Sequence, residues 1–387
     1  MLLLKNVDLY TPAPAGRTDI LIAGGRIERV APDLGVSESY CEVFDASALV
    51  AVPGFVDSHV HLAGGGGEGS YRTRTPELLL SDAIRGGVTT VVGCLGTDGV
   101  TRSPENLLAK ARGLEEEGIS TFIYSGYYAV PVRTITGSIE RDLLLIDKVI
   151  GVGEVALSDH RSTQPTFDEF VRVAAEARRG GMLSGKAGVV NVHMGDGPRG
   201  LSLLERSVKE TEIPASQFLP THINRNPALF EEGTAWAKAG GFVDFTTSTV
   251  QASLDEGEVP CAVGLRRMLE AGVDVSQITF SSDGQGSLPR FDERGRLSGL
   301  GVGRVTSLFA AARDAAQCEG LPLEVALQVI TLNPARILKL HRKGQVAAGS
   351  DADVVLLDPG ELDIRGVIAK GEWLMKNGEP AAKGTFE

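Results

Sequence analysis

The sequence is poor in cysteine and has no long apolar run. Its four cysteines, Cys41, Cys94, Cys261 and Cys318, are scattered and form no CxxC pair, a usage typical of a reducing compartment. No stretch approaches the roughly 18 apolar residues that a membrane helix needs, and the N-terminal Met1-Leu-Leu-Leu-Lys5 is too short for the apolar part of a signal peptide. We therefore expect a soluble, cytoplasmic protein.

Positive charge is also scarce in this chain. Lys and Arg number 38 against 50 Asp and Glu, which gives a net charge of −12. Such a charge repels polyanions, so the composition argues against a nucleic-acid or anionic-membrane partner. An acidic small molecule would have to be bound by local arginines.

The pattern of the 387 residues changes twice along the chain. Residues 1–52 show short apolar strands separated by turns. Over residues 53–342 an apolar strand, a polar loop and an amphipathic helix alternate eight times, the number that closes a TIM barrel. Residues 343–387 return to short strands. The pattern predicts an α/β fold, with a (β/α)8 TIM barrel and a small β-sandwich domain formed from both chain termini.

Strand and helix signals give approximate bounds inside the predicted barrel. Helices are predicted over Pro104–Glu117 and Pro227–Ala239, for example, because Pro is favoured in the first turn. The Gly- and Arg-rich stretch Gly284–Gly303 is predicted to be a mobile loop. The barrel strands are expected to begin near Val52, Val88, Ser120, Val149, Val189, Phe218, Phe242 and Ile278.

The first barrel strand ends in His59-Val60-His61. Side chains of a strand alternate between faces, so both imidazoles project to the same side. Two imidazoles on one face of a rigid strand end are a natural start to a metal site. The alternative is a pair of solvent-facing histidines beside a Gly-rich loop.

Other residues that can bind a metal lie at the ends of further predicted strands. The active site of a TIM barrel is formed at the carboxyl ends of its strands. His193 ends the fifth strand, His222 the sixth, and Asp283 the eighth. Glu154 lies within the apolar fourth strand, where an unpaired acid would cost several kcal/mol. Either a metal or an ion pair with a neighbouring Arg would account for Glu154.

Four histidines and two carboxylates around one barrel mouth can hold two divalent cations. His and carboxylate ligands with open positions favour zinc in a hydrolytic role. The metals would lower the pKa of a bridging water and polarise a carbonyl group. Asp283 would take the proton of that water and pass it to the leaving amine, as general base and then acid.

These residues resemble the pattern of the amidohydrolase superfamily, which has HxH on strand one, a carboxylate on strand four, His on strands five and six, and Asp on strand eight. Across essentially the whole chain the likeness extends to the isoaspartyl dipeptidases (β-aspartyl peptidases). The motifs that carry it are His61-Leu-Ala-Gly-Gly-Gly-Gly-Glu68, Val92-Gly-Cys-Leu-Gly-Thr-Asp98, Val130-Pro-Val-Arg-Thr-Ile-Thr-Gly-Ser138, Ser158-Asp-His-Arg-Ser162, Thr221-His-Ile-Asn-Arg-Asn226 and Ser281-Ser-Asp-Gly-Gln-Gly-Ser287.

The resemblance implies roles for individual residues. Glu68 would bind the α-ammonium of the substrate, although without the likeness it reads as a solvated loop acid. Tyr128 would donate a hydrogen bond to the carbonyl oxygen as it becomes an oxyanion. Arg161 and Arg225 would bind the carboxylates, and Thr97 and Ser287 would add hydrogen bonds. The metal ligands would be His59, His61, Glu154, His193, His222 and Asp283.

The best-known members of this family carry a carboxylated Lys where this chain has Glu154. Glu has the same terminal group and charge, but its stem is shorter by about 3 Å. Our hypothesis is that Glu154 itself bridges two Zn²⁺ ions per subunit, with no need for Lys carboxylation. Lys186 lies in a Gly-rich loop before the fifth strand, and we interpret it as structural.

The function predicted from these residues is zinc-dependent hydrolysis of the β-linked amide of isoaspartyl dipeptides by a metal-bridged hydroxide. A dipeptide with two carboxylates and one ammonium matches two Arg and one Glu. The closest alternative is another amidohydrolase, a cyclic-amide hydrolase or an N-acyl-D-amino-acid deacylase. A cyclic amide offers no free ammonium for Glu68. A third alternative is a non-catalytic scaffold protein that has lost its metals. Such a protein would lack some of the metal ligands, whereas every ligand position is filled in this sequence. Members of this family tend to form large homo-oligomers, so we expect this protein to be a homo-oligomer as well.

Overall fold

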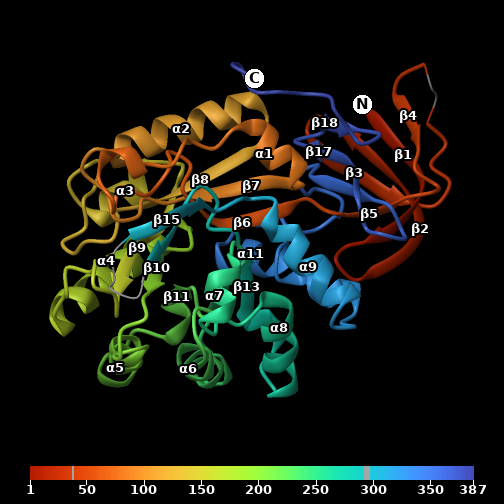
Figure 1. Cartoon of the computed structure of the whole chain (residues 1–387). Coiled ribbons are helices and arrows are strands. Elements are labelled where there is room, and N and C mark those ends of the chain that lie inside the picture. Colours follow the sequence, from red (N-terminus) through yellow and green to blue (C-terminus); the bar gives the residue numbers. More distant parts are fainter. Residues whose placement is uncertain (37–38, 292–296) are drawn as a thin grey trace.

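Eight parallel strands form the centre of the molecule (Figure 1). The structure is a computed structural model that describes residues 1–36, 39–291 and 297–387. Six of the strands form one hydrogen-bonded sheet in the order β11-β10-β9-β8-β7-β6, and β12 pairs with β13. The strands are β6 (Phe55–Val60), β7 (Val88–Gly93), β8 (Ser120–Ser125), β9 (Val149–Leu157), β10 (Val189–Met194), β11 (Phe218–Thr221), β12 (Val243–Thr246) and β13 (Ile278–Ser281).

Backbone hydrogen bonds just beyond the strands close this ring. On one side, the amide of Ile223 donates to the carbonyl of Asp244 at 3.1 Å, joining the end of β11 to β12. On the other side, the amide of His61 donates to Gly284 at 2.8 Å, and the amide of Asp283 donates to His59 at 3.1 Å. The predicted barrel is therefore confirmed, and its closure places the ends of β6 and β13 beside each other.

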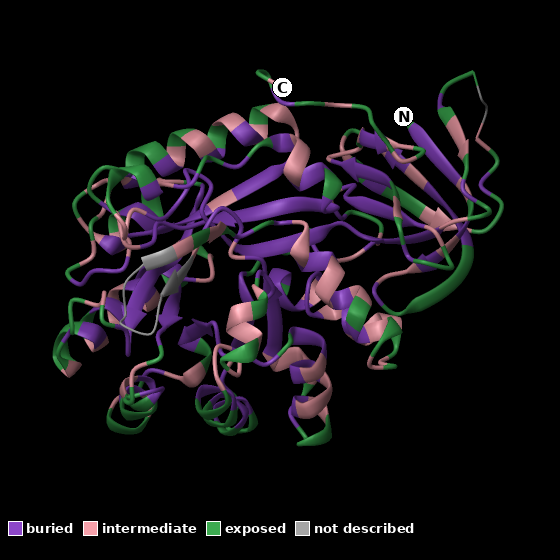
Figure 2. Cartoon of the chain, in the orientation of Figure 1, coloured by how far each residue is buried: buried purple, intermediate pink, exposed green. Residues whose placement is uncertain are grey.

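Helices cover the outside of the barrel, with their buried faces toward the strands (Figure 2). The predicted start at Pro104 is correct because Ser103 caps the helix by accepting from the Asn106 amide. Asn226 caps the helix that starts at Pro227 in the same way. The helices are α1 (Leu80–Arg85), α2 (Pro104–Glu117), α3 (Ile139–Leu145), α4 (Phe167–Ser184), α5 (Ser202–Glu210), α6 (Pro227–Lys238), α7 (Gln251–Asp255), α8 (Cys261–Glu270), α9 (Ser307–Gln317), α10 (Leu323–Gln328) and α11 (Leu332–Ile337), with 3₁₀ turns η1 (Tyr71–Thr73), η2 (Ala215–Gln217) and η3 (Val275–Gln277). Within the part of the chain that the structure describes, no helix is both long and apolar enough to cross a membrane.

Strands from the two ends of the chain form a second sheet beside the barrel (Figure 1). Its path is β19-β18-β17-β16-β5-β1-β2-β3, and β4 pairs with β1 off this path. β5 and β16 join the N-terminal and C-terminal parts, with Val52 opposite Val355. The predicted β domain from both termini is thus confirmed, whereas the domain boundaries after residues 52 and 342 stay a prediction. Its strands are β1 (Leu2–Tyr10), β2 (Pro14–Ala23), β3 (Arg26–Ala31), β4 (Glu42–Asp45), β5 (Val50–Pro53), β16 (Val354–Leu357), β17 (Ile364–Ala369), β18 (Glu372–Lys376) and β19 (Glu379–Pro380).

A hairpin follows the last barrel strand. β14 (Ser287–Phe291) pairs antiparallel with β15 (Leu297–Val302), with Ser287 opposite Val302. The prediction of a loop over 284–303 is therefore wrong for these strands, and residues 292–296 lie outside the described residues. Ser287, the first residue of the hairpin, lies four residues after Asp283, and its hydroxyl donates to the Glu68 carboxylate.

Candidate active site

Six predicted metal ligands meet at the carboxyl ends of the barrel strands. His59, Glu154 and His193 lie in β6, β9 and β10, and each is at most 2% exposed. His61 and His222 directly follow β6 and β11, and Asp283 is the second residue after β13. Parallel strands present their carboxyl ends at one rim, so the closed barrel brings these side chains together.

The first cluster joins the HxH histidines to two carboxylates. Asp283 Oδ1 lies 3.0 Å from His61 Nε2 and 3.7 Å from His59 Nε2. Glu154 Oε2 lies 3.4 Å from His59 Nε2 and 3.8 Å from His61 Nε2. Two imidazole nitrogens and two carboxylate oxygens thus converge on one point.

The second cluster uses the other oxygen of the same Glu154. Oε1 lies 2.7 Å from His193 Nδ1 and 3.1 Å from His222 Nε2. Glu154 therefore stands between the two clusters and turns one carboxylate oxygen toward each. One carboxylate therefore offers a possible ligand atom to each cluster.

Buried atoms in the first cluster fit a cation. Among the described residues, His59 Nε2, Glu154 Oε2 and Asp283 Oδ1 are buried without a hydrogen-bond partner. Buried polar atoms without partners are costly, and His nitrogens and carboxylate oxygens are ligands that divalent zinc accepts. The donor set therefore fits a divalent cation. Cys94 also lies beside His59, His61 and Glu154, but its Sγ is 3.9 Å from His61 Nδ1, the ring nitrogen opposite the one that faces Asp283.

Side chains behind the histidines fix the orientation of the rings. Asn191 Oδ1 lies 3.1 Å from His59 Nδ1, and Asp159 Oδ2 lies 2.9 Å from His193 Nε2. Thr246 Oγ1 is hydrogen-bonded to His222 Nδ1. Such outer partners select which ring nitrogen is free for a metal. Sequence reasoning gave these residues no role, although Asn191 precedes His193 by two positions and so shares its face of β10.

Charges within the clusters shift the pKa values of their members. Burial lowers the pKa of His59, but the negative charges of Cys94 and Glu154 outweigh it and raise that pKa well above its usual value. For His222 burial dominates, and with the nearby charges of His193 and Arg225 it lowers the pKa to about 3. The HxH end of the site therefore attracts positive charge, while His222 stays neutral and able to act as a ligand.

A loop of glycines carries Glu68 to the rim. Gly66 has φ 74°, and a Cβ there would lie 2.5 Å from the carbonyl oxygen of Thr73, so a larger residue would not fit. Glu68 Oε1 accepts a hydrogen bond from Thr97 at 3.1 Å, and Ser287 donates to Oε2 at 3.1 Å. The structure thus brings Glu68, Thr97 and Ser287 together, with the carboxylate held by two hydroxyl groups.

Arg161 stands between Glu68 and the second cluster. Its Nη1 lies 3.3 Å from Glu68 Oε1, and its Nη2 lies 2.7 Å from Asp159 Oδ2. Its guanidinium also lies 5.3 Å from the centre of the Tyr128 ring. Arg225 is half-buried, and its Nε donates to the carbonyl of Met194 at 3.0 Å. Both arginines are therefore close to the clusters, one beside Glu68 and one beside His222.

Tyr128 faces the second cluster from the loop after β8. Its hydroxyl lies 2.9 Å from His193 Nδ1. Burial, followed by the negative charge of Glu154, raises the pKa of Tyr128 well above its usual value. The phenol therefore keeps its proton throughout the neutral and mildly basic range and can donate a hydrogen bond.

Asp244 is a buried carboxylate inside the barrel, below the clusters. It accepts hydrogen bonds from Thr221 at 2.7 Å and from Thr279 at 2.6 Å. Burial nevertheless raises its pKa to about 6. The folded protein therefore binds this proton more tightly than the unfolded chain does, and the contribution of Asp244 to stability is lost as the pH rises through the folded-state pKa.

We expect Asp244→Asn to gain stability relative to the original protein as the pH rises. The substitution removes the charge but keeps one acceptor oxygen, so the free energy of unfolding should improve by about 2 kcal/mol between about pH 4 and about pH 8, relative to the unsubstituted chain. Urea denaturation of both proteins at the two pH values measures this difference. A difference that does not change with pH would contradict the assignment.

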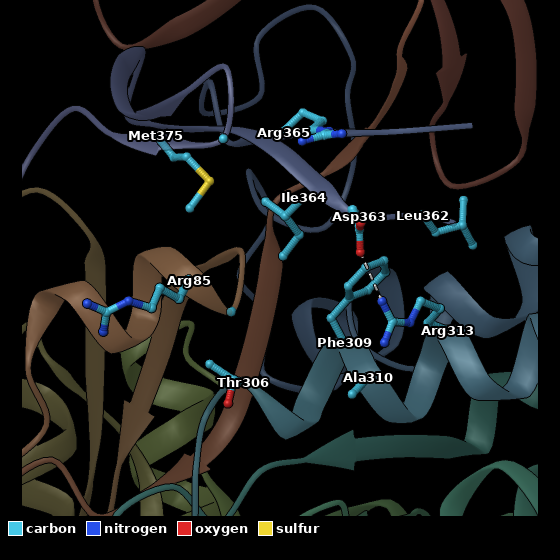
Figure 3. A pocket seen from close by; sticks show the side chains of 12 residues that line it. Arg85, Thr306, Phe309, Ala310, Arg313, Leu362, Asp363, Ile364, Arg365 and Met375 are labelled. Atoms are coloured by element: carbon cyan, nitrogen blue, oxygen red, sulfur yellow. Dashed lines mark hydrogen bonds and ion pairs between the residues drawn. The ribbon is translucent and has the colours of Figure 1, made fainter. Parts of the chain in front are cut away.

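Two other features lie apart from the clusters. A cavity of about 340 Å³ lies between barrel helices and the terminal sheet. Arg85, Phe309, Arg313 and Ile364 are among the residues that line it (Figure 3). None of the predicted site residues lines it. Lys186 Nζ donates to the carbonyls of Leu143 and Ile146, at 2.8 and 2.6 Å, so its structural interpretation is confirmed.

The sequence was compared with models of known protein families. The model of the amidohydrolase family matches residues 50–380. The chain belongs to the amidohydrolase family. The predictions of an amidohydrolase fold and of a hydrolase that acts on amide bonds are therefore confirmed, and the clustered His and Glu side chains indicate a metal site.

The chain is similar to several individual enzymes. It is 48% identical to the β-aspartyl dipeptidase of the thermophilic, keratin-degrading Fervidobacterium islandicum AW-1, whose crystal structure contains the β-Asp-Leu dipeptide; the TM-score is 0.92, over 98% of this chain and 97% of that one. The dihydroorotase of Staphylococcus epidermidis is 42% identical over 91 residues, 24% of this chain and 21% of that enzyme. The allantoinase of Deinococcus radiodurans is 26% identical over 408 residues, 93% of this chain and 87% of that enzyme. The predicted resemblance to β-aspartyl dipeptidases is thus confirmed.

Proposed function

We propose that this amidohydrolase hydrolyses the β-linked amide of isoaspartyl dipeptides with the help of two zinc ions. The observation that carries the proposal is the contact between Glu68 and Arg161 next to the two histidine–carboxylate clusters. An acid and a guanidinium side by side complement an ammonium and a carboxylate on one carbon atom, which is what the α-carbon of an isoaspartyl residue carries. The likeness to the Fervidobacterium enzyme supports the same substrate class.

The two clusters would hold the cations. His59, His61 and Asp283 would bind the first, His193 and His222 the second, and Glu154 would bind both. When bound, divalent cations supply Lewis acidity toward the amide carbonyl and lower the pKa of a water molecule. Zinc suits a site of imidazole and carboxylate ligands.

The protein's own side chains would bind and orient the dipeptide. Glu68, held by Thr97 and Ser287, would accept hydrogen bonds from the α-ammonium, and Arg161 would bind the α-carboxylate of the same residue. Arg225, on the His222 side, would bind the carboxylate of the leaving residue. An α-linked dipeptide presents its ammonium and carboxylate at other positions, so this pairing favours the β isomer.

Proton transfer would fall to Asp283, and oxyanion stabilisation to Tyr128. Burial raises the pKa of Asp283, but the charges of His61 and its neighbours outweigh it and hold that pKa below its usual value. The carboxylate is therefore ionised at neutral pH, as a general base must be, and it can return the proton to the leaving amine. The Tyr128 hydroxyl would donate to the carbonyl oxygen as negative charge develops there.

Hydrolysis of β-Asp-Leu beside α-Asp-Leu tests this function. Zinc-loaded protein is expected to cleave the β isomer only, and prior treatment with a chelator should abolish the cleavage until zinc is restored. Cleavage of neither isomer by protein that binds zinc would refute the substrate assignment. Cyclic amides and N-acyl-D-amino acids would then be tested as substrates. The cytoplasmic location and the homo-oligomeric state of the protein stay predictions.

A further inference from the structure

Asp159 lies between a candidate metal ligand and a candidate substrate-binding residue. It follows β9, and its side chain is 3% exposed. Its Oδ1 accepts hydrogen bonds from the Arg161 amide at 2.7 Å and from Arg161 Nε at 2.9 Å. Its Oδ2 lies 2.7 Å from Arg161 Nη2 and 2.9 Å from His193 Nε2. One buried carboxylate thus contacts both residues at once.

The contact with His193 determines which ring nitrogen faces the second cluster. Asp159 Oδ2, at 2.9 Å, is closer to Nε2 than the donor Arg161 Nη2, at 3.2 Å. A carboxylate only accepts, so this closer contact favours the tautomer of His193 that carries its proton on Nε2. The lone pair of Nδ1 then points toward Glu154 Oε1, 2.7 Å away. Nδ1 and Oε1 are then two acceptors side by side, an arrangement that a cation bound to both would stabilise. Asp159 therefore prepares His193 to act as a metal ligand.

The contact with Arg161 determines which edge of the guanidinium is free. A guanidinium has five N–H donors, and Asp159 takes the edge formed by Nε and Nη2. The edge formed by Nη1 and Nη2 makes only longer contacts, at 3.3 Å from Nη1 to Glu68 Oε1 and at 3.2 Å from Nη2 to His193 Nε2. A substrate carboxylate can bind that edge with two parallel hydrogen bonds.

We propose that Asp159 is a positioning residue that couples recognition of the substrate α-carboxylate to retention of the cation at His193 and His222. The proposal rests on the proposed function for the identity of the substrate. Because one carboxylate orients both partners, its loss should weaken cation binding and α-carboxylate binding together. A purely structural residue would not link these two properties.

The test compares Asp159→Asn with Asp159→Ala and with the control Asp196→Asn. Asn presents an NH₂ group where Asp159 has an acceptor, so it favours the wrong tautomer of His193, whereas Ala only removes the contacts. Asp196 is an exposed carboxylate two residues after β10. Cations per chain are measured during competition with a chelator, and kcat and KM are measured for β-Asp-Leu and β-Ala-Leu. The second dipeptide keeps the ammonium and the amide but lacks the α-carboxylate.

We expect both Asp159 variants to lose one of two cations at chelator concentrations about 10- to 100-fold lower than the original protein. In zinc-saturated protein, KM for β-Asp-Leu should rise about tenfold or more, while KM for β-Ala-Leu changes little. Asp196→Asn should match the original protein in both measurements. Far-UV circular dichroism checks that the variants are folded.

Unchanged cation retention in folded Asp159→Asn, or equal changes of KM for both dipeptides, would overturn the coupling. A failure of the proposed function has a different signature, in which the original protein binds its cations but cleaves no β-aspartyl dipeptide. The competition for cations then still decides whether Asp159 positions His193. The KM comparison is decisive only for the link to the substrate.

Discussion

Asp283→Asn is expected to lower kcat for β-Asp-Leu by about 10³-fold, the range associated with loss of a general base. In the original protein Asp283 Oδ1 lies 3.0 Å from His61 Nε2. The asparagine side chain keeps one oxygen that can occupy this position. It cannot accept the proton of the attacking water, however. The side chain should therefore lose its proton-transfer role while much of the local packing is retained.

Steady-state kinetics of zinc-loaded protein measure this effect, with Asp255→Asn as the matched control. Asp255 is an exposed carboxylate on α7, so its substitution makes the same chemical change away from the clusters. Cations per chain are counted for every protein, which separates a loss of zinc from a loss of the base. A fully zinc-loaded Asp283→Asn protein with nearly unchanged kcat would exclude Asp283 as the proton acceptor.

Glu154→Gln should lower activity on β-Asp-Leu by a similar factor, because it weakens the binding of the cations. Glu154 offers one oxygen to each cluster and is 1% exposed. Glutamine replaces one of these oxygens by an NH₂ donor and removes the negative charge that lies among four imidazoles. Removal of one partner from a buried charged cluster costs about 3–5 kcal/mol, which corresponds to cation binding about 10²- to 5 × 10³-fold weaker.

Metal analysis after dialysis tests the Glu154 hypothesis directly. We expect fewer zinc ions per chain in Glu154→Gln than in the original protein and in the control Glu205→Gln, an exposed acid on α5. Activity on β-Asp-Leu should fall in parallel with the zinc content. An unchanged zinc content would reject Glu154 as the bridging ligand.

The barrel and the two clusters were predictable because they follow from local sequence rules. The alternation of strand side chains places His59 and His61 on one face whatever the rest of the chain does. The strand-end positions of His193, His222 and Asp283 then need only the barrel topology to bring them together. Glu154 was identifiable because an acid inside an apolar strand is unfavourable unless a cation or an ion pair compensates its charge.

Contacts that depend on how loops pack could not be predicted in the same way. Asp159 stands in the motif Ser158-Asp-His-Arg-Ser162, yet nothing in the motif indicates that its two oxygens contact both Arg161 and His193. The hairpin of β14 and β15 was also missed, because glycine is normally depleted in strands. Its pairing of Ser287 with Val302 depends on tertiary context.

The position of β5 affects how the protein can form during synthesis. In the finished sheet β5 lies between β1 and β16, and its Val52 and Pro53 are buried. β16 leaves the ribosome roughly 300 residues after β5, which at about 5–20 residues per second is a delay of roughly 15–60 s. Throughout this delay one edge of an apolar strand has no neighbour, and such an edge can pair with other chains. During synthesis, the edge of β5 that faces β16 in the finished sheet is thus open to pairing with other chains until β16 has emerged.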